Sequence, residues 1–133
     1  MATNASDRQP HIVVVGPCAS GKTTLVEELK IRGFDAAVCG QEHSEIPNLW
    51  QHSNPDVLVL LDIDLETIRS RRGQDWSESI YHVQLERLRQ ARGAADLIID
   101  TSASSTQRTI EETLAHLREN FERKEFVAPG GDN

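Results

Sequence analysis

The sequence has 133 residues, which is the usual size of one domain and too few for two ordinary domains. Hydrophobic residues make up 38% of the chain and charged residues 26%, as is typical of a soluble globular protein with a modest core. The formal net charge of -7 argues against a general nucleic-acid binder or membrane-surface binder, because both need a basic face.

The sequence shows neither the features of a secretion signal nor those of a membrane span. Residues 1–10 lack the basic start and apolar run of a secretion signal, and no apolar stretch approaches the roughly 20 residues of a membrane span. We therefore expect a cytoplasmic protein in which Cys18 and Cys39 are either ordinary reduced thiols or a redox-sensitive pair. The polar segments 1–10 and 127–133 are expected to be flexible, around one compact domain at residues 11–126.

The first half of the chain predicts a strand, a helix and a second strand. "HIVVVGP" (residues 11–17) is a continuous β-branched run, which suits a strand buried on both faces of a parallel sheet. Residues 22–32 predict a helix whose apolar face ends before Gly33. "FDAAVCG" (34–40) predicts a shorter strand, and the Asn, Ser and Pro residues that follow predict a loop with one helical turn.

The second half continues the alternation. "DVLVLLDI" (56–63) predicts a strand, and Asp64 and Gly73 bound a short helix at residues 65–72. Asp75 with Glu78 resembles a capping box for a longer helix. Its inner face is expected to use Ile80, Val83, Leu88 and Ala91.

"ADLIIDTS" (95–102) predicts the last strand. Ser104 with Gln107 is a capping pattern for a final helix, whose apolar face contains Ile110, Leu114, Leu117 and Phe121. Strands that alternate with helices predict a parallel sheet of about four strands inside a three-layer α/β/α sandwich. Such sheets bind ligands beyond the carboxyl ends of their strands.

The segment "GPCASGKTT" (16–24) matches the phosphate-binding pattern G-x-x-x-x-G-K-[ST], known as Walker A, between a predicted strand and a predicted helix. Backbone N–H groups of such a turn surround phosphate oxygens, and the helix N-terminus adds partial positive charge. Lys22 is expected to contact the β- and γ-phosphates of ATP, and the Thr23 hydroxyl to bind Mg²⁺. The expected nucleotide-binding residues are Gly16, Ala19, Ser20, Gly21, Lys22, Thr23 and Thr24.

Phosphoryl transfer also needs an acidic group near the metal or the attacking atom. Asp62 ends a strand in the manner of a Walker B metal ligand, and Glu42 follows the second strand. We favour Glu42 slightly as the base or the water-mediated metal contact; the alternatives are that Asp62 only ends its strand and that Glu42 is a solvated loop residue. His43 either orients an acceptor or forms an ordinary hydrogen bond in the loop.

Arginines cluster in the middle of this acidic chain. Arg69 and Arg72 are three residues apart on one predicted helix, which places both on one side and within reach of bound phosphates. Their alternative role is a solvated helix surface. For Arg87 and Arg92 the two roles remain equally open.

With these residues in place, the chain resembles a P-loop kinase of the nucleotide-kinase superfamily, which implies the P-loop NTPase fold. The segment from "VLVLLDIDLETIRSRRG" through "AADLIIDTSAS" (57–104) is similar to the second half of dephospho-coenzyme A kinases. The resemblance implies that Arg69 and Arg72 contact ATP phosphates and that residues 101–105 lie beside the adenine. Residues 40–56 replace the larger substrate-binding insertion of those kinases, which points to a small acceptor.

The leading hypothesis is therefore a compact ATP-dependent phosphotransferase whose acceptor binds at "QEHSEIPNLW" (41–50). Trp50 or Trp76 either stacks on a flat substrate or belongs to the core. The alternative hypothesis is a regulatory nucleotide-binding module with little or no kinase activity. A GTPase is a weaker interpretation, because no N-K-x-D base-recognition motif occurs.

Overall fold

The computed structural model describes residues 10–122, so the predictions for residues 1–9 and 123–133 lie outside it. Its strands are β1 (His11–Val15), β2 (Asp35–Val38), β3 (Val57–Asp62) and β4 (Leu97–Asp100). Its α-helices are α1 (Lys22–Ile31), α2 (Leu65–Arg72), α3 (Glu78–Arg87), α4 (Arg89–Ala94) and α5 (Thr106–Leu117). Two short 3-10 helices, η2 (Gln41–His43) and η3 (Leu49–Ser53), lie between β2 and β3, and α5 continues as a π-helical turn, Arg118–Glu122.

The four strands form one sheet in the order β2-β1-β3-β4, and every neighbouring pair is parallel. β1 and β3 are central, which explains why both are continuous apolar runs. β2 is the direct neighbour of β1. The loop after β1 and the loop after β2 therefore leave the same edge of the sheet side by side.

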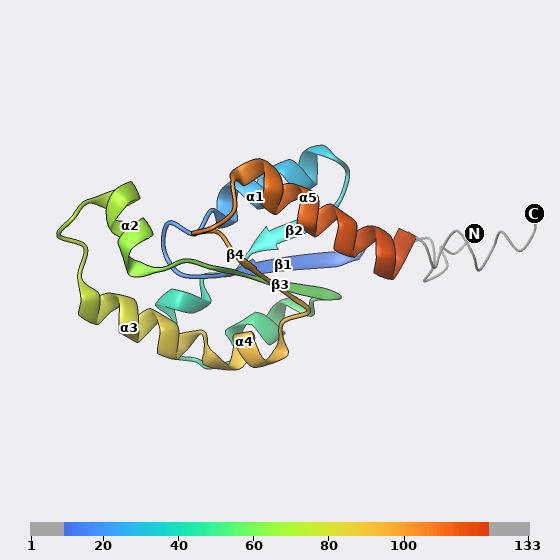
Figure 1. Ribbon diagram of the computed structural model, residues 1–133. Coiled ribbons are helices and arrows are strands. Elements are labelled where there is room, and N and C mark those ends of the chain that lie inside the picture. The colour runs from blue at the N-terminus through green and yellow to red at the C-terminus, as the bar shows by residue number, and fades with distance from the viewer. Residues whose placement is uncertain (1–9, 123–133) are drawn as a thin grey trace, which may run out of the picture.

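Alternate side chains of the central strands pack into two separate hydrophobic cores, one on each face of the sheet. Val14 and Val59 face one core, with side chains of α1 and α5, and Val13 and Leu58 face the other, with Leu88 and further side chains around α4. Figure 1 shows α1 and α5 on one face of the sheet and α3 and α4 on the other. The predicted three-layer α/β/α sandwich is confirmed.

The single helix predicted after Asp75 is two helices in the structure, and different residues form its buried face. It is divided at Leu88 into α3 and α4, and the predicted inner residues Ile80 and Val83 are 49% and 45% exposed. The reason is that α3 packs chiefly against η2 beyond the strands, where the buried side chain is Gln84. Leu88, at the break, is fully buried as predicted.

Two predicted N-caps were displaced along the chain. The Ser77 side chain caps α3 instead of Asp75, and the Ser105 side chain caps α5 instead of Ser104. Each serine immediately precedes its helix in extended backbone, where its oxygen reaches an N–H of the first turn. Asp64 caps α2 as predicted. The Phe121 side chain lies outside the part of the chain that the structure describes.

Among residues 10–122, no helix combines the length and the apolar character needed to cross a lipid bilayer.

Candidate functional site

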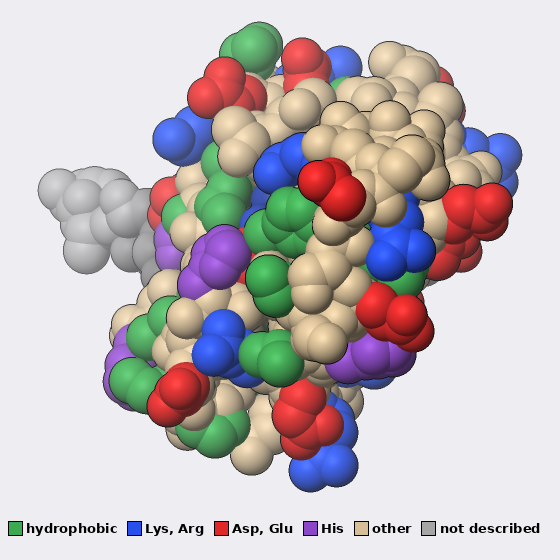
Figure 2. Space-filling view, turned by 90° about the vertical axis from the view of Figure 1, so that its left-hand side faces the viewer, with side chains coloured by type: hydrophobic (Ala, Val, Ile, Leu, Met, Phe, Trp, Pro, Cys, Tyr) green, Lys and Arg blue, Asp and Glu red, His purple; other side chains and the backbone are tan. Residues whose placement is uncertain are grey.

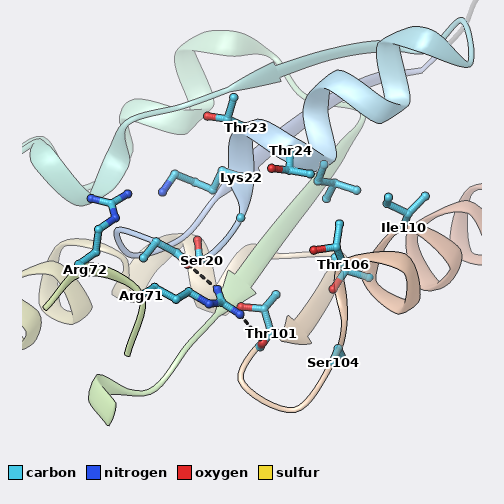
Figure 3. Close-up of a pocket in the computed structure, with 14 residues that line it drawn as sticks. Ser20, Lys22, Thr23, Thr24, Arg71, Arg72, Thr101, Ser104, Thr106 and Ile110 are labelled. Atoms are coloured by element: carbon cyan, nitrogen blue, oxygen red, sulfur yellow. Dashed lines mark hydrogen bonds between the residues drawn. The ribbon is translucent and has the colours of Figure 1, made fainter. Parts of the chain in front are cut away.

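A pocket of about 450 Å³ lies at the carboxyl ends of the strands. Three segments far apart in sequence form it: the loop and first turn of α1, the end of α2, and the segment from β4 into α5 (Figure 3). Its lining residues are Ala19, Ser20, Gly21, Lys22, Thr23, Thr24, Leu25, Arg71, Arg72, Thr101, Ser104, Thr106, Thr109 and Ile110. Figure 2, which looks onto this end of the molecule, shows basic and acidic side chains interspersed on the surface.

The loop before α1 has the backbone of an anion-binding turn. Ala19 and Gly21 have positive φ angles of 67° and 98°. A side chain at Gly16 would collide with the Leu61 carbonyl oxygen and the Ser20 hydroxyl, so only glycine lets the loop pass this close to β3. α1 has no side-chain N-cap, and the residues of its first turn line the pocket. The N–H groups that a helix N-terminus leaves without intrahelical partners are therefore at the pocket.

Lys22 is held inside this loop. Its Nζ donates hydrogen bonds to the carbonyl oxygens of Gly16 and Pro17, both at 2.9 Å, and lies 3.0 Å from Oε2 of Glu42. The Lys22 side chain is 10% exposed and that of Glu42 only 4%. In a poorly solvated setting each charge is stabilised mainly by the other, which makes the pair strongly interdependent.

Glu42 is a buried residue of η2 and not a solvated loop residue. Its Oε1 atom is buried and has no hydrogen-bond partner among the described residues. His43 is exposed, and its Nε2 lies 3.4 Å from Glu42 Oε2. Arg87 donates to the backbone carbonyl of Glu42 at 3.4 Å, which ties α3 to this loop.

Asp62, the other predicted acid, forms a two-pronged ion pair with Arg92. The two guanidinium nitrogens of Arg92 lie 2.9 and 3.0 Å from the two carboxylate oxygens, and this hydrogen bonding raises the pKa of Arg92. Asp62 is not among the residues that line the pocket. Arg92, whose role the sequence left undecided, therefore joins α4 to the end of β3 through Asp62.

The three arginines of α2 point to different places, and only two of them line the pocket. Arg72 lines the pocket, whereas Nε of Arg69 donates to the Trp76 carbonyl at 3.0 Å and Arg69 does not line it. Arg71, which the sequence analysis did not select, lines the pocket and donates to the carbonyls of Ala19 at 2.6 Å and Thr101 at 3.3 Å. Figure 3 shows Arg71 between the loop that carries Ser20 and the chain at Thr101. Helical spacing could not identify it, because the spacing does not tell which face of α2 turns toward the loop.

Gln84 is a second residue that sequence reasoning missed. It is 3% exposed, its Oε1 accepts from the backbone N–H of Cys18 at 3.0 Å, and its Nε2 donates to the Cys18 thiol sulfur at 3.2 Å. Cys18 and Cys39 are both free thiols. Trp50 packs against the core that contains Cys39, and its backbone N–H donates to Gln41.

Comparisons with known proteins agree with this architecture. No protein-family model matches the chain. Over 86 residues, 60% of the chain, it is 27% identical to the guanine nucleotide-binding protein G(f) subunit alpha of Drosophila melanogaster, and the match spans 22% of that protein.

The fold is similar to the crystal structure of the YorR protein from Bacillus subtilis in complex with phosphorylated GDP. The TM-score is 0.58 at 14% sequence identity, and the match covers 82% of this chain and 97% of YorR. The parallel sheet, its helices and this structural likeness show a P-loop NTPase fold.

Proposed function

We propose that this protein binds the magnesium complex of a nucleoside triphosphate in the pocket and transfers the γ-phosphate to a small acceptor in the cytoplasm. One observation carries the proposal: the pocket joins the glycine-containing loop of residues 16–24 to Arg71 and Arg72 of α2 across a space of about 450 Å³. Phosphoryl transfer needs little from a protein beyond positioning and charge neutralisation, and these elements supply both.

The phosphate side of the pocket fits a polyanion. The first turn of α1 supplies N–H groups and the positive end of the helix dipole. Ser20 lines the pocket and is 1% exposed, and its hydroxyl has no hydrogen-bond partner among the described residues, so it could bond a ligand oxygen. The Lys22 ammonium needs to move only from the loop carbonyls toward the pocket that Lys22 already lines.

Mg²⁺ would be held by the Thr23 hydroxyl together with phosphate oxygens, and bound there it would neutralise charge on the transferring group. Asp62 would have to release Arg92 before it could join this site. Glu42, already next to Lys22, is the better placed acid.

The acceptor side is formed by η2, η3 and the loop between them. Attraction of Lys22 to the phosphates would release the Glu42 carboxylate. This carboxylate could then accept the proton of an acceptor hydroxyl while the hydroxyl oxygen attacks the γ-phosphorus. The diphosphate leaves as its bond to the γ-phosphorus breaks. Since only residues 39–56 separate β2 from β3, the acceptor must be small.

ATP is the proposed donor because the resemblance to dephospho-coenzyme A kinases implies it. In support, Thr101 and Ser104 line the pocket in the segment where that resemblance places the adenine. One similar protein is named as a guanine nucleotide-binding protein and the YorR structure contains phosphorylated GDP, so GTP is the competitor to test.

The alternative is a nucleotide-binding regulatory module without efficient transfer. The observation that favours it is the small region between β2 and β3, in which the structure contains two 3-10 helices. On this alternative the nucleotide still binds in the same pocket, and only the acceptor chemistry is missing.

The test is to titrate the full chain with Mg-ATP and Mg-GTP by calorimetry and then follow ³²P transfer from the preferred nucleotide to a panel of small alcohols, nucleosides and nucleotides. Lys22→Met should abolish binding, whereas Lys30→Met, on the exposed face of the same helix, should leave it unchanged. Binding with labelled acceptor supports the phosphotransferase, and binding without any labelled acceptor supports the module. Failure of the wild-type chain to bind either nucleotide would refute both.

A further inference from the structure

Three metal-ligating side chains of different types converge beside the phosphate loop. Cys18 belongs to that loop, and Glu42 and His43 belong to η2, which follows the neighbouring strand. One ligand atom from each, a sulfur, a carboxylate oxygen and an imidazole nitrogen, lies within 4.8 Å of the other two. None of the three lines the nucleotide pocket, although Glu42 contacts Lys22, which does.

Two of the three distances between these atoms are close to those of a tetrahedral zinc site. Zinc–sulfur bonds of about 2.3 Å and zinc–nitrogen or zinc–oxygen bonds of about 2.0–2.1 Å separate neighbouring ligand atoms by about 3.3–3.6 Å. In the structure Cys18 Sγ lies 3.8 Å from His43 Nε2, which lies 3.4 Å from Glu42 Oε2. Shifts of a few tenths of an ångström would close these two edges around one ion.

A buried side chain orients the sulfur ligand. Gln84 is 3% exposed and bonds Cys18 twice, accepting from its N–H and donating to its sulfur. Hydrogen bonds from such outer residues to a ligating atom fix its direction and stabilise the thiolate.

One oxygen of the Glu42 carboxylate, Oε1, has unused capacity for a cation, whereas Oε2 is already paired with the Lys22 ammonium at 3.0 Å. Glu42 is 3% exposed, and its Oε1 has no partner among residues 10–122. A buried carboxylate oxygen without a hydrogen bond is costly unless a ligand reaches it. His43, at 64% side-chain exposure, opens the cluster to solvent and gives an ion a path of entry.

We propose that Cys18, Glu42 and His43 form a three-ligand site for a single zinc ion, with water as the fourth ligand. Thiolate and imidazole select zinc over magnesium, which prefers oxygen ligands in an octahedron. Binding replaces the thiol proton of Cys18, which passes to solvent. The ion would join the phosphate loop to η2, and it would occupy Glu42, so it would inhibit the phosphoryl transfer proposed above; the binding site itself does not depend on that function.

The test uses Co²⁺ as an optical probe of the reduced, full-length chain in the absence of nucleotide. A thiolate-to-cobalt charge-transfer band in the near ultraviolet, with intense visible bands of four-coordinate cobalt, is the expected result. Displacement of Co²⁺ by Zn²⁺ then gives the zinc affinity. Absence of the charge-transfer band in the wild-type protein would overturn the proposal.

Matched variants assign the ligands. Cys18→Ser should remove the charge-transfer band, and Glu42→Gln and His43→Gln should each weaken Zn²⁺ binding at least about tenfold. Gln84→Ala should weaken it about 10–100-fold through the sulfur. The controls are Cys39→Ala and His82→Gln; His82 is also 64% exposed and lies 3.5 Å from a glutamate oxygen, that of Glu78.

Circular dichroism of each variant distinguishes loss of a ligand from loss of the fold. A folded Cys18→Ser protein that keeps the charge-transfer band, or a His82→Gln protein that loses affinity as much as His43→Gln, would overturn the assignment. Because no nucleotide is present, failure here leaves the proposed phosphate chemistry untouched, and failure of nucleotide binding leaves the zinc site untouched.

Discussion

The Lys22 ammonium lies 3.0 Å from Oε2 of Glu42, and both side chains are at least nine-tenths buried. The pair joins the phosphate loop after β1 to η2 after β2, and these two strands are neighbours in the sheet. A residue expected to bind phosphate and a residue expected to act as the base therefore hold each other in place.

Glu42→Gln should separate the roles of the pair. Nucleotide affinity should be kept or increased, because Lys22 loses a competing anion, while acceptor-dependent turnover should fall about 10²–10⁴-fold through loss of the base. Calorimetry and the ³²P transfer assay measure the two effects. Unchanged turnover would remove Glu42 from the chemistry.

The same pair should show strong coupling in a double-mutant cycle. Lys22→Met leaves a buried carboxylate without its cation, and Glu42→Gln leaves a buried ammonium without its anion. We expect the double change to lower the free energy of unfolding by less than the sum of the two single changes. The difference, the coupling energy, should be about 1–3 kcal/mol. Urea unfolding measures it, and additive effects would show that the two charges are independently solvated.

Arg71→Ala should weaken nucleotide binding about tenfold or more, because the change removes a charged hydrogen-bond donor from the pocket. Arg71→Lys should restore only part of the affinity, since a single ammonium cannot bridge the Ala19 and Thr101 carbonyls as the guanidinium does. Arg69→Ala is the control, with an expected change of less than about threefold. A larger effect at Arg69 than at Arg71 would mean that Arg69 leaves the Trp76 carbonyl to contact the nucleotide.

Asp62→Asn should act on stability rather than on metal binding. The change removes the charge that both guanidinium nitrogens of Arg92 contact, and we expect a loss of about 1 kcal/mol in the free energy of unfolding. Arg92→Met should have an effect of similar size. The magnesium dependence of nucleotide binding is the second readout, and a marked rise in the Mg²⁺ requirement of Asp62→Asn alone would make Asp62 a metal contact.

The Asp64 cap should make α2 sensitive to acid. Hydrogen bonds from Thr67 lower the pKa of Asp64, so its contribution to stability is present above its ordinary pKa and is lost as the pH falls through the lowered value, below about pH 4. Asp64→Asn keeps a cap without this titration, whereas Asp64→Ala should lose about 1 kcal/mol at neutral pH. Thermal unfolding of the wild-type protein and both variants from pH 7 to pH 3 tests this, and an identical pH profile for the wild-type and Asp64→Asn proteins would contradict it.

The sequence alone determined the fold class and the phosphate loop. Both are local signals: the apolar runs of β1 and β3 are long enough to require burial on both faces, and the glycines, Lys22 and Thr23 have a fixed spacing that follows directly on β1. These local signals do not determine the strand order. In the structure β2 adjoins β1, and this brings Glu42 to the phosphate loop.

The tertiary structure decided which charged groups meet. Periodicity placed Arg69 with Arg72 on one face of α2, but the docking of that helix turns Arg71 toward the Ala19 carbonyl, 52 residues away in sequence. Periodicity likewise predicted that Ile80 and Val83 lie on the inner face of α3. The helix instead extends beyond the strands and buries Gln84 against Cys18. Spacing along one element defines its faces, whereas the partner of each face depends on how elements distant in sequence pack, and that information is not local.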